Sequence, residues 1–270
     1  MKLLKHLLTL ALTLSFAFLE AGPNIDPYSE IGLFGGTSYY IGEINRTHFP
    51  FRLMQPAAGL FYRYNLNGHY ALRAFVNYSE VKAYDAYSTN SFNLQRALSF
   101  KSPIIELGGH LEFNFYEFAL LRVALRKITP FVFGGINYFY FNPQGDLGGG
   151  NYVNLQPLKT EGKRYSRHQI AIPVGVGVKF KFGRLGLSAE WGIRKTFTDY
   201  IDDVSSTYPD PTGLSPEAQI LSNKTGLPYQ SIIGKQRGDS TDKDYYIFTG
   251  FTVSYRINKV DACPDFKSRK

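Results

Sequence analysis

Apolar and polar residues alternate along much of the chain. In the segment 245–257 the odd-numbered positions, from Tyr245 to Ile257, are mostly apolar, whereas the even-numbered positions become polar toward Arg256. Because successive side chains of a β-strand point to opposite faces, this pattern predicts an amphipathic strand. Eight such segments occur, at residues 30–44, 56–67, 69–84, 102–118, 128–142, 167–182, 183–197 and 245–257.

The connections between these segments differ in length. Residues 65–69 and 181–184 are tight turns and 117–127 is intermediate, whereas 43–55, 85–101, 143–165 and 198–243 are long. Most segments exceed the about 9–11 residues that a tilted strand needs to cross a bilayer. The sequence therefore predicts an all-β fold, an eight-stranded antiparallel transmembrane β-barrel of the outer-membrane type over residues 22–257. A soluble β-sandwich, whose apolar faces pack together, is the alternative.

The longest connection, residues 198–243, is rich in Pro, Gly, Ser, Thr and Asp. This composition is typical of loops, and we expect the segment to be exposed and polar. Within it, residues 215–226 begin with Ser215 and Pro216 and end with Gly226. Serine before the first turn, proline in it and glycine after the last turn predict a short helix.

The N-terminus has the features of an export signal. Lys2 and Lys5 precede an apolar stretch at residues 7–19, and small residues follow at Ala21 and Gly22. We expect a signal peptide at residues 1–21 that is cleaved from the mature protein. The overall charge of +8 is spread over turns and loops, which argues against nucleic-acid binding.

The inward positions of the predicted strands collect polar residues. An eight-stranded barrel has an interior just wide enough for side chains, so charged groups there must pair with one another. The predicted lumen residues are Arg63, Arg73, Glu106, His110, Glu112, Lys179, Glu190, Arg194 and Arg256, together with Asn65, Asn77, Asn114 and Lys181. They predict a plug of ion pairs, and the alternative is a path for protons or ions.

Catalytic and cofactor chemistry has little support in the sequence. Ser166 and His168 are candidates for a lipid hydrolase, but side chains two apart on one strand are about 7 Å apart, too far for a direct hydrogen bond. His48, His69 and His110 lie on separate segments without metal-ligand spacing. The glycine-rich stretch at 145–150 lacks the Lys-Ser/Thr of a phosphate-binding loop. We therefore expect neither a cofactor, a metal nor a small-molecule substrate.

Several segments resemble the PorG family, an outer-membrane barrel component of the type IX secretion system of Bacteroidota. The similar stretches are EIGLFGGTSYYIGEIN, PAAGLFYRYNLNGHYALRA, TPFVFGGINYFYFNP, IPVGVGVKF, GLSAEWGIRKTFTDYIDDVSSTY and GDSTDKDYYIFTGFTVSYRI. They cover nearly the whole mature chain in matching order and spacing. The most specific is the segment ending in TDYIDDVSSTY, followed by GDSTDKD before the last strand.

This resemblance implies a non-enzymatic role in a secretion machine. Its implied partners are a periplasmic ring lipoprotein and the protein associated with it, and in gliding species the machine also serves motility. The rival functions are a generic structural or adhesive barrel and a lipid-modifying enzyme. With both termini in the periplasm, residues 258–270 would form a periplasmic tail that carries Cys263, the only cysteine. Cys263 is thus a candidate for contact with a partner, through a disulfide or not.

Overall fold

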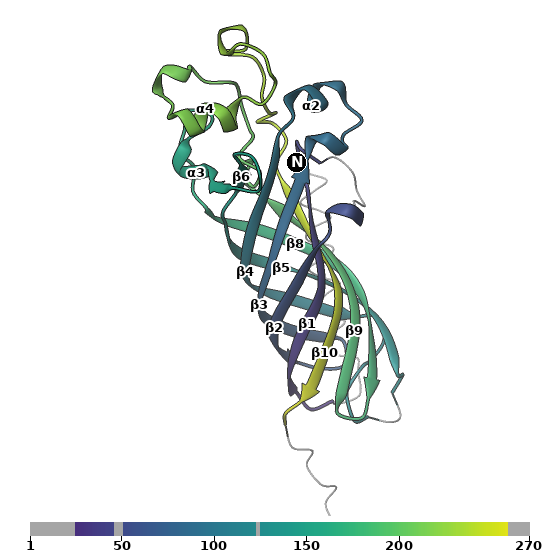
Figure 1. Cartoon of the computed structure of the whole chain (residues 1–270). Helices are drawn as coiled ribbons and strands as arrows, with labels where there is room; N and C mark the ends of the chain where they lie inside the picture. The colour runs from purple at the N-terminus through teal and green to yellow at the C-terminus, as the bar shows by residue number, and fades with distance from the viewer. Residues whose placement is uncertain (1–24, 46–50, 123–124, 259–270) are drawn as a thin grey trace, which may run out of the picture.

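Eight long strands form a closed antiparallel barrel in the computed structural model, which describes residues 25–45, 51–122 and 125–258 (Figure 1). The barrel strands are β1 (Tyr28–Ile41), β2 (Gln55–Asn65), β3 (Tyr70–Tyr84), β4 (Ser99–Asn114), β5 (Ile128–Phe141), β8 (His168–Phe182), β9 (Leu185–Thr196) and β10 (Tyr245–Arg256). Neighbours follow the order β3-β2-β1-β10-β9-β8-β5-β4, and pairing of β3 with β4 closes the ring. The predicted eight-stranded barrel is confirmed.

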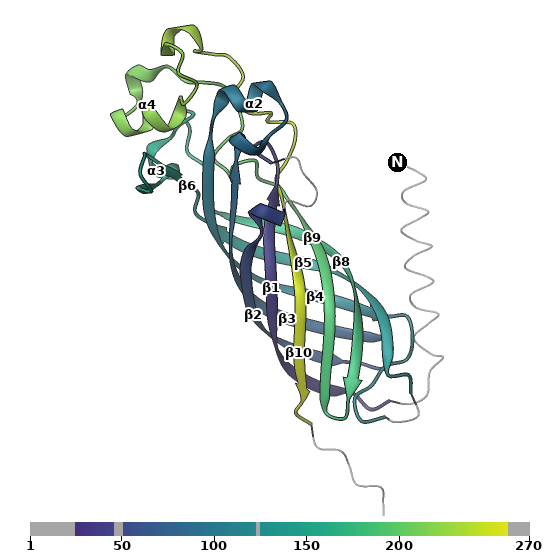
Figure 2. The same cartoon turned by 45° about the vertical axis from the view of Figure 1, so that its right-hand side comes forward.

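The two ends of the barrel differ. The turns after β2 and β8 and the connection after β4 lie at one end, here called the turn end. Both β1 and β10 meet there, with Glu30 opposite Arg256 in the register. The long connections after β1, β3, β5 and β9 lie at the other end, here called the loop end, where they build a cap (Figure 2).

Short elements organise the cap at the loop end. A small hairpin of β6 (Gln144–Asp146) and β7 (Tyr152–Asn154) extends the sheet next to β4. The helices are η1 (Phe51–Leu53), η2 (Asp85–Tyr87), α2 (Ser91–Arg96), α3 (Leu155–Leu158), η3 (Pro211–Gly213), α4 (Pro216–Ser222) and η4 (Tyr229–Ser231). The predicted helix is present as α4, with the Ser215 hydroxyl accepting a hydrogen bond from the Ala218 N–H, but it ends before Gly226. Within the described ranges, no helix is both long and apolar enough to cross a membrane.

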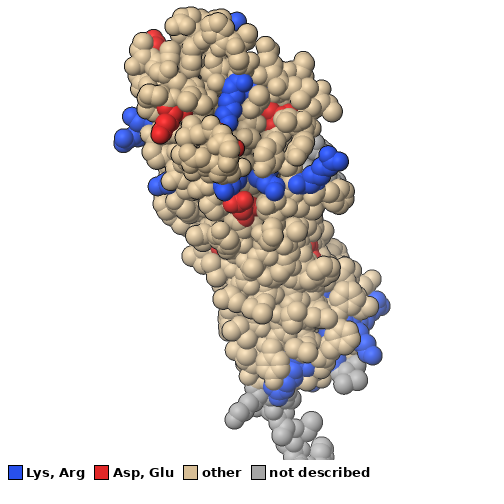
Figure 3. All heavy atoms as spheres, in the orientation of Figure 1, with Lys and Arg blue, Asp and Glu red and all other residues tan. Residues whose placement is uncertain are grey.

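The outer face of the barrel is apolar. Side chains on the outward positions remain exposed, including Leu33 at 59%, Ile136 at 67% and Phe251 at 71%. On the face drawn in Figure 3, few charged side chains reach the surface over the middle of the barrel, whereas Lys and Arg gather toward its two ends. An apolar belt around a closed ring of strands is the architecture of an integral outer-membrane barrel. It excludes the sandwich alternative, in which these side chains would pack against a second sheet.

Two apolar clusters occupy the interior near the ends of the barrel. At the turn end, the segment after β4 packs Phe118 and Leu120 against Ile25 and Tyr28. At the loop end, a larger cluster includes Tyr40, Phe100, Ile104, Phe139, Phe141, Ile201 and Tyr246. The polar lumen lies between them, because the inward positions of β4 pass from Phe100 and Ile104 to Glu106, His110 and Glu112 toward the turn end.

Candidate functional site

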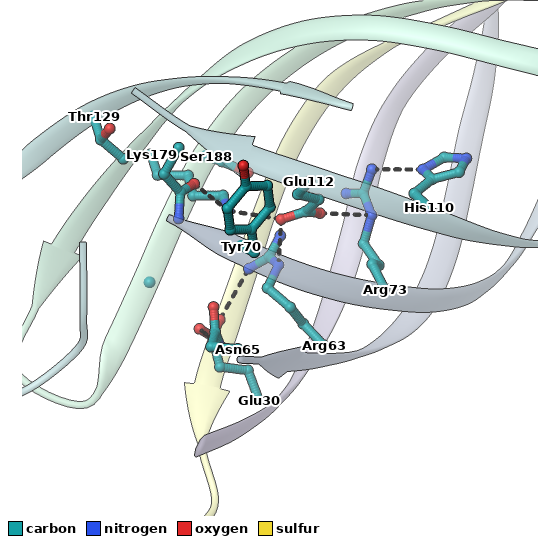
Figure 4. Close-up of polar contacts among 12 residues, drawn as sticks. Glu30, Arg63, Asn65, Tyr70, Arg73, His110, Glu112, Thr129, Lys179 and Ser188 are labelled. Carbon is teal, nitrogen blue, oxygen red and sulfur yellow. Dashed lines mark hydrogen bonds and ion pairs between the residues drawn. The ribbon is translucent and has the colours of Figure 1, made fainter. Parts of the chain in front are cut away.

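All thirteen predicted lumen residues lie on the inner face of the barrel. Their side chains converge from β2, β3, β4, β8, β9 and β10, and the contacts nearest the turn end are drawn in Figure 4. Twelve of the thirteen residues are buried and Glu190 is half-buried. The lumen is therefore the largest assembly of charged groups in the described part of the barrel, and it is the candidate functional site.

Glu112 is the centre of this assembly. Its carboxylate lies 2.9 Å from Arg63 Nε, 3.0 Å from Arg73 Nε and 2.6 Å from Lys179 Nζ. Lys179 also donates a hydrogen bond of 2.8 Å to Asn114 Oδ1. Three cations on one buried carboxylate would carry excess positive charge, which is costly in an environment without water.

Two further carboxylates remove that excess. Glu30 lies 2.9 Å from Arg63 Nη1, and Glu190 lies 2.7 Å from Arg73 Nη1. Glu30 also accepts hydrogen bonds from Asn65 Nδ2 at 2.8 Å and from Ser254 Oγ at 2.5 Å. Three carboxylates thus balance three cations, and we call these six residues the central ionic cluster: Glu30, Arg63, Arg73, Glu112, Lys179 and Glu190.

A second ionic contact lies closer to the loop end. Glu106 is 3.3 Å from Arg194 Nε and accepts a hydrogen bond of 2.6 Å from the Tyr246 hydroxyl. Arg194 also donates to the Gly192 carbonyl at 2.6 Å. The side chain of Glu106 is completely buried, so bulk water at the loop end does not reach its carboxylate.

His110 forms hydrogen bonds with Arg73 of the central ionic cluster and with Asn137 of β5. Arg73 Nη2 is 3.1 Å from His110 Nδ1, and His110 Nε2 is 3.1 Å from Asn137 Oδ1. Because a guanidinium can only donate, Nδ1 must accept and Nε2 must carry the proton. The ring also stacks on Phe133, with centroids 4.9 Å apart. These partners hold His110 as one neutral tautomer, which does not favour the alternative of a proton path.

Arg256 differs from the other predicted lumen residues. Its guanidinium donates to the Leu120 carbonyl at 3.0 Å and lies 4.4 Å from the centre of the Tyr28 ring. It therefore packs against the apolar cluster at the turn end, whereas we predicted pairing with a lumen carboxylate. The backbone after β4, whose position the sequence pattern does not reveal, takes the place of that carboxylate.

Sequence reasoning missed Glu30, Asn137 and Tyr246 as lumen groups. Glu30 shares its parity with Gly32 and Phe34, whereas Ile31 and Leu33 lie outside. The alternation in the first strand was sufficient to place Glu30 inside. For Tyr246 the signal is weaker, since tyrosine occurs on both faces of β10.

Ser166 and His168 do not form a nucleophile–base pair. The Ser166 hydroxyl donates to the His168 carbonyl at 3.1 Å and accepts from its backbone N–H at 3.2 Å. The His168 imidazole instead contacts the Tyr138 hydroxyl, 2.7 Å from Nδ1. Both residues are exposed at the start of β8. The expected lack of a direct bond between these side chains is confirmed.

The long loop 198–243 is more buried than its composition predicts. Ile201, Val204 and Arg237 are almost completely inaccessible. Arg237 Nη1 lies 2.8 Å from Glu161, and Arg96 forms two contacts of 2.8 and 2.7 Å with Asp85. Arg96 also donates to the Arg237 carbonyl at 2.7 Å, so these ion pairs connect three loops. The expectation that the whole loop is exposed is therefore wrong, because buried arginines hold its two ends against neighbouring loops.

A family model described as "Domain of unknown function (DUF6089)" matches residues 5–215. The chain belongs to this DUF6089 family. Among curated proteins, no match was found. The predicted signal peptide, the tail after Asn258 and Cys263 fall outside the described residues of this family member.

Several solved structures are similar to the chain. The attachment invasion locus protein Ail of Yersinia pestis is 9% identical with a TM-score of 0.42, covering 86% of this chain and 100% of Ail. Neisserial surface protein A is 12% identical with a TM-score of 0.38, covering 86% and 97%. The outer membrane enzyme PagL is 13% identical with a TM-score of 0.33, covering 85% and 99%. The assignment as an outer-membrane barrel rests on the strand pairings and the apolar belt of this chain itself.

Proposed function

We propose that this protein is a non-enzymatic outer-membrane barrel with a closed lumen, which acts through its two ends and not as a channel. The observation that carries the proposal is the burial of the lumen charges. Glu106 and Glu112 have no exposed surface, and apolar clusters lie on both sides of them. An ion crossing this lumen would have to break the central ionic cluster, in which every carboxylate has a cationic partner within 3.0 Å.

We further propose that the protein is a component of a type IX secretion machine, where it associates with the periplasmic ring lipoprotein and its partner. The similarity to the PorG family over nearly the whole mature chain supports this role. Both termini would then be periplasmic and the cap extracellular. Protease added to intact cells should cut between residues 209 and 236 and spare the tail after residue 258, and cleavage of the tail alone would reverse the orientation.

A deletion strain tests the role in secretion. Without the gene, cargo proteins should accumulate in the periplasm, and the wild-type gene should restore their release to the medium. Purification of the tagged protein in mild detergent should recover the ring lipoprotein. Normal secretion by the deletion strain would instead favour the alternative function of a generic structural or adhesive barrel.

The lipid-modifying alternative is distinguished by lipid analysis of the same strains. If the protein were an enzyme, the deletion would change the structure of lipid A or of phospholipid. The wild-type gene would then restore the lipid, whereas a gene carrying Ser166→Ala would not. We expect no change in either lipid, since the Ser166 hydroxyl bonds backbone atoms and not the imidazole of His168.

A further inference from the structure

Four acidic residues meet at the loop end of the barrel, outside the lumen. Glu43 follows β1, Asp199 and Asp202 follow β9, and Asp244 precedes β10. The strands dictate this meeting, because Ile41 pairs with Tyr245 and Tyr245 pairs with Lys195. Asp199 and Asp202 lie in the segment TDYIDDVSSTY, and Asp244 is the last residue of the segment GDSTDKD. These two segments are the most specific part of the sequence resemblance, and the function proposed above does not explain them.

The four carboxylates are buried without enough donors. Each residue is at most 5% exposed. The Tyr40 hydroxyl lies 2.6 Å from Asp202, 2.7 Å from Asp244 and 3.4 Å from Glu43, although it has a single proton to donate. Backbone N–H groups supply only one contact each to Asp202 and Asp244 within 3.0 Å. The arginines of the cap are engaged elsewhere, Arg96 by Asp85 and Arg237 by Glu161.

Asp199 is the clearest sign of a missing positive partner. It is 2% exposed, and neither of its carboxylate oxygens accepts a hydrogen bond of acceptable length and angle, although Ser205 and Lys243 are near enough to interact with it. A buried carboxylate without a partner is strongly unfavourable unless it is protonated or binds a metal ion. One oxygen each of Glu43, Asp199 and Asp244 lie within 4.8 Å of one another, so Asp199 points into the group.

The chemistry of these ligands favours calcium. Ca²⁺ binds 6–8 oxygen ligands at about 2.3–2.6 Å in flexible geometry, whereas Mg²⁺ demands near-ideal octahedral geometry and keeps several of its waters. The three carboxylate oxygens lie within 4.8 Å of one another, which is inside the about 5 Å that separates ligands on opposite sides of a calcium ion. A set of carboxylates from three separate segments therefore suits calcium.

We propose that Glu43, Asp199 and Asp244 form a calcium site that connects the ends of β1, β9 and β10 beneath the cap. Asp202 and Tyr40 complete its polar surroundings. A divalent cation supplies the positive charge that these buried carboxylates lack and would hold the long loop against β1.

A surface pocket reaches one residue of the site from the loop side. Glu43 lines this pocket of about 400 Å³ together with Lys195, Thr241, Asp242, Lys243 and Tyr245. Thr241 and Asp242 are exposed. Glu43 is 5% exposed and is the least buried of the four carboxylates.

The test uses the full mature chain, refolded in detergent without lipopolysaccharide, stripped with EDTA and titrated with CaCl₂ by calorimetry. We expect one saturable site with a dissociation constant on the order of 10⁻⁴ M, as in extracellular calcium modules. Calcium should also raise the melting temperature. Tb³⁺ should bind at the same site with tyrosine-sensitised luminescence, because Tyr40 is adjacent, and Ca²⁺ should displace it.

Asp199→Asn is the discriminating variant, and Asp242→Asn is its matched control on the exposed side of the pocket. Asp199→Asn should weaken calcium binding at least about tenfold and lose the shift in melting temperature, while Asp242→Asn should behave as wild type. The absence of saturable calcium binding to the wild type would overturn the proposal, even if Asp199→Asn did not fold. Unchanged binding by Asp199→Asn, or Mg²⁺ binding as tight as Ca²⁺, would overturn it as well.

Discussion

Removing the charge of Glu112 should destabilise the barrel strongly. Glu112→Gln keeps the size of the side chain but leaves Arg63, Arg73 and Lys179 facing only Glu30 and Glu190. The side chain of Glu112 is fully buried, and its three cationic contacts are 2.6–3.0 Å long. Loss of one partner from a buried ionic group typically costs about 3–5 kcal/mol, because an uncompensated charge remains. We expect a loss of this size in the free energy of unfolding.

The balance of charges predicts a rescue. Lys179→Met removes the surplus cation from the Glu112→Gln background, so the central ionic cluster returns to equal numbers of carboxylates and cations. The double variant should be more stable than the sum of the two single losses predicts, by about 1–3 kcal/mol. Glu80→Gln makes the same chemical change on the half-exposed outer face of β3 and should change stability by less than about 0.5 kcal/mol.

The only tryptophan provides the assay. Trp191 lies at an outward position of β9, half-buried in the absence of lipid. Its emission should shift to longer wavelength when urea unfolds the barrel out of lipid vesicles, and the midpoint gives the stability of each variant. A loss below about 1 kcal/mol for Glu112→Gln would refute the reasoning, since it would mean that water screens the lumen charges.

Three further outcomes test other parts of the account. Val176 is 52% exposed on the apolar belt, so Val176→Arg should cost about 2–4 kcal/mol in the Trp191 assay and Val176→Leu almost nothing; equal stability would place this position outside the lipid. A methyl group added at Gly36 would lie 2.2 Å from the Thr249 carbonyl oxygen, whereas one added at Gly35 would meet no other segment within 4 Å. Gly36→Ala should therefore slow or prevent the heat-modifiable gel shift, and Gly35→Ala should not. The reverse result would mean that the inner and outer faces of β1 are assigned the wrong way round. If the tail binds its partner covalently, a non-reducing gel should show a larger species that Cys263→Ser removes, and a monomer alone after thiol-blocking lysis would exclude the disulfide.

The barrel was predictable because its signal is repeated and local. Each strand alternates by itself, and eight repeats with short and long connections leave few other architectures. The lumen list follows from the same parity. Glu30 was missed although it obeys the rule, since it stands at the very start of the first segment, where glycines and aromatic residues dominate the inner face.

Contacts between distant segments were not predictable in the same way. Arg256 meets the Leu120 carbonyl because the connection after β4 folds into the turn end, and no periodicity records that path. Likewise, residues 198–243 have the composition of an exposed loop, yet their ends are buried by partners more than a hundred residues away, such as Arg96. The meeting of Glu43, Asp199 and Asp244 depends on the register of β1, β10 and β9, which the sequence does not specify.

The electrical conductance of the purified barrel in a planar lipid bilayer shows whether the lumen is closed. We expect no stepwise conductance for the wild type at moderate voltage, because the ions would have to displace the partners of Glu106 and Glu112. Stable conductance steps from the wild-type protein, changed in size or ion selectivity by Glu112→Gln, would show instead that the lumen is an open path and that the barrel is a channel.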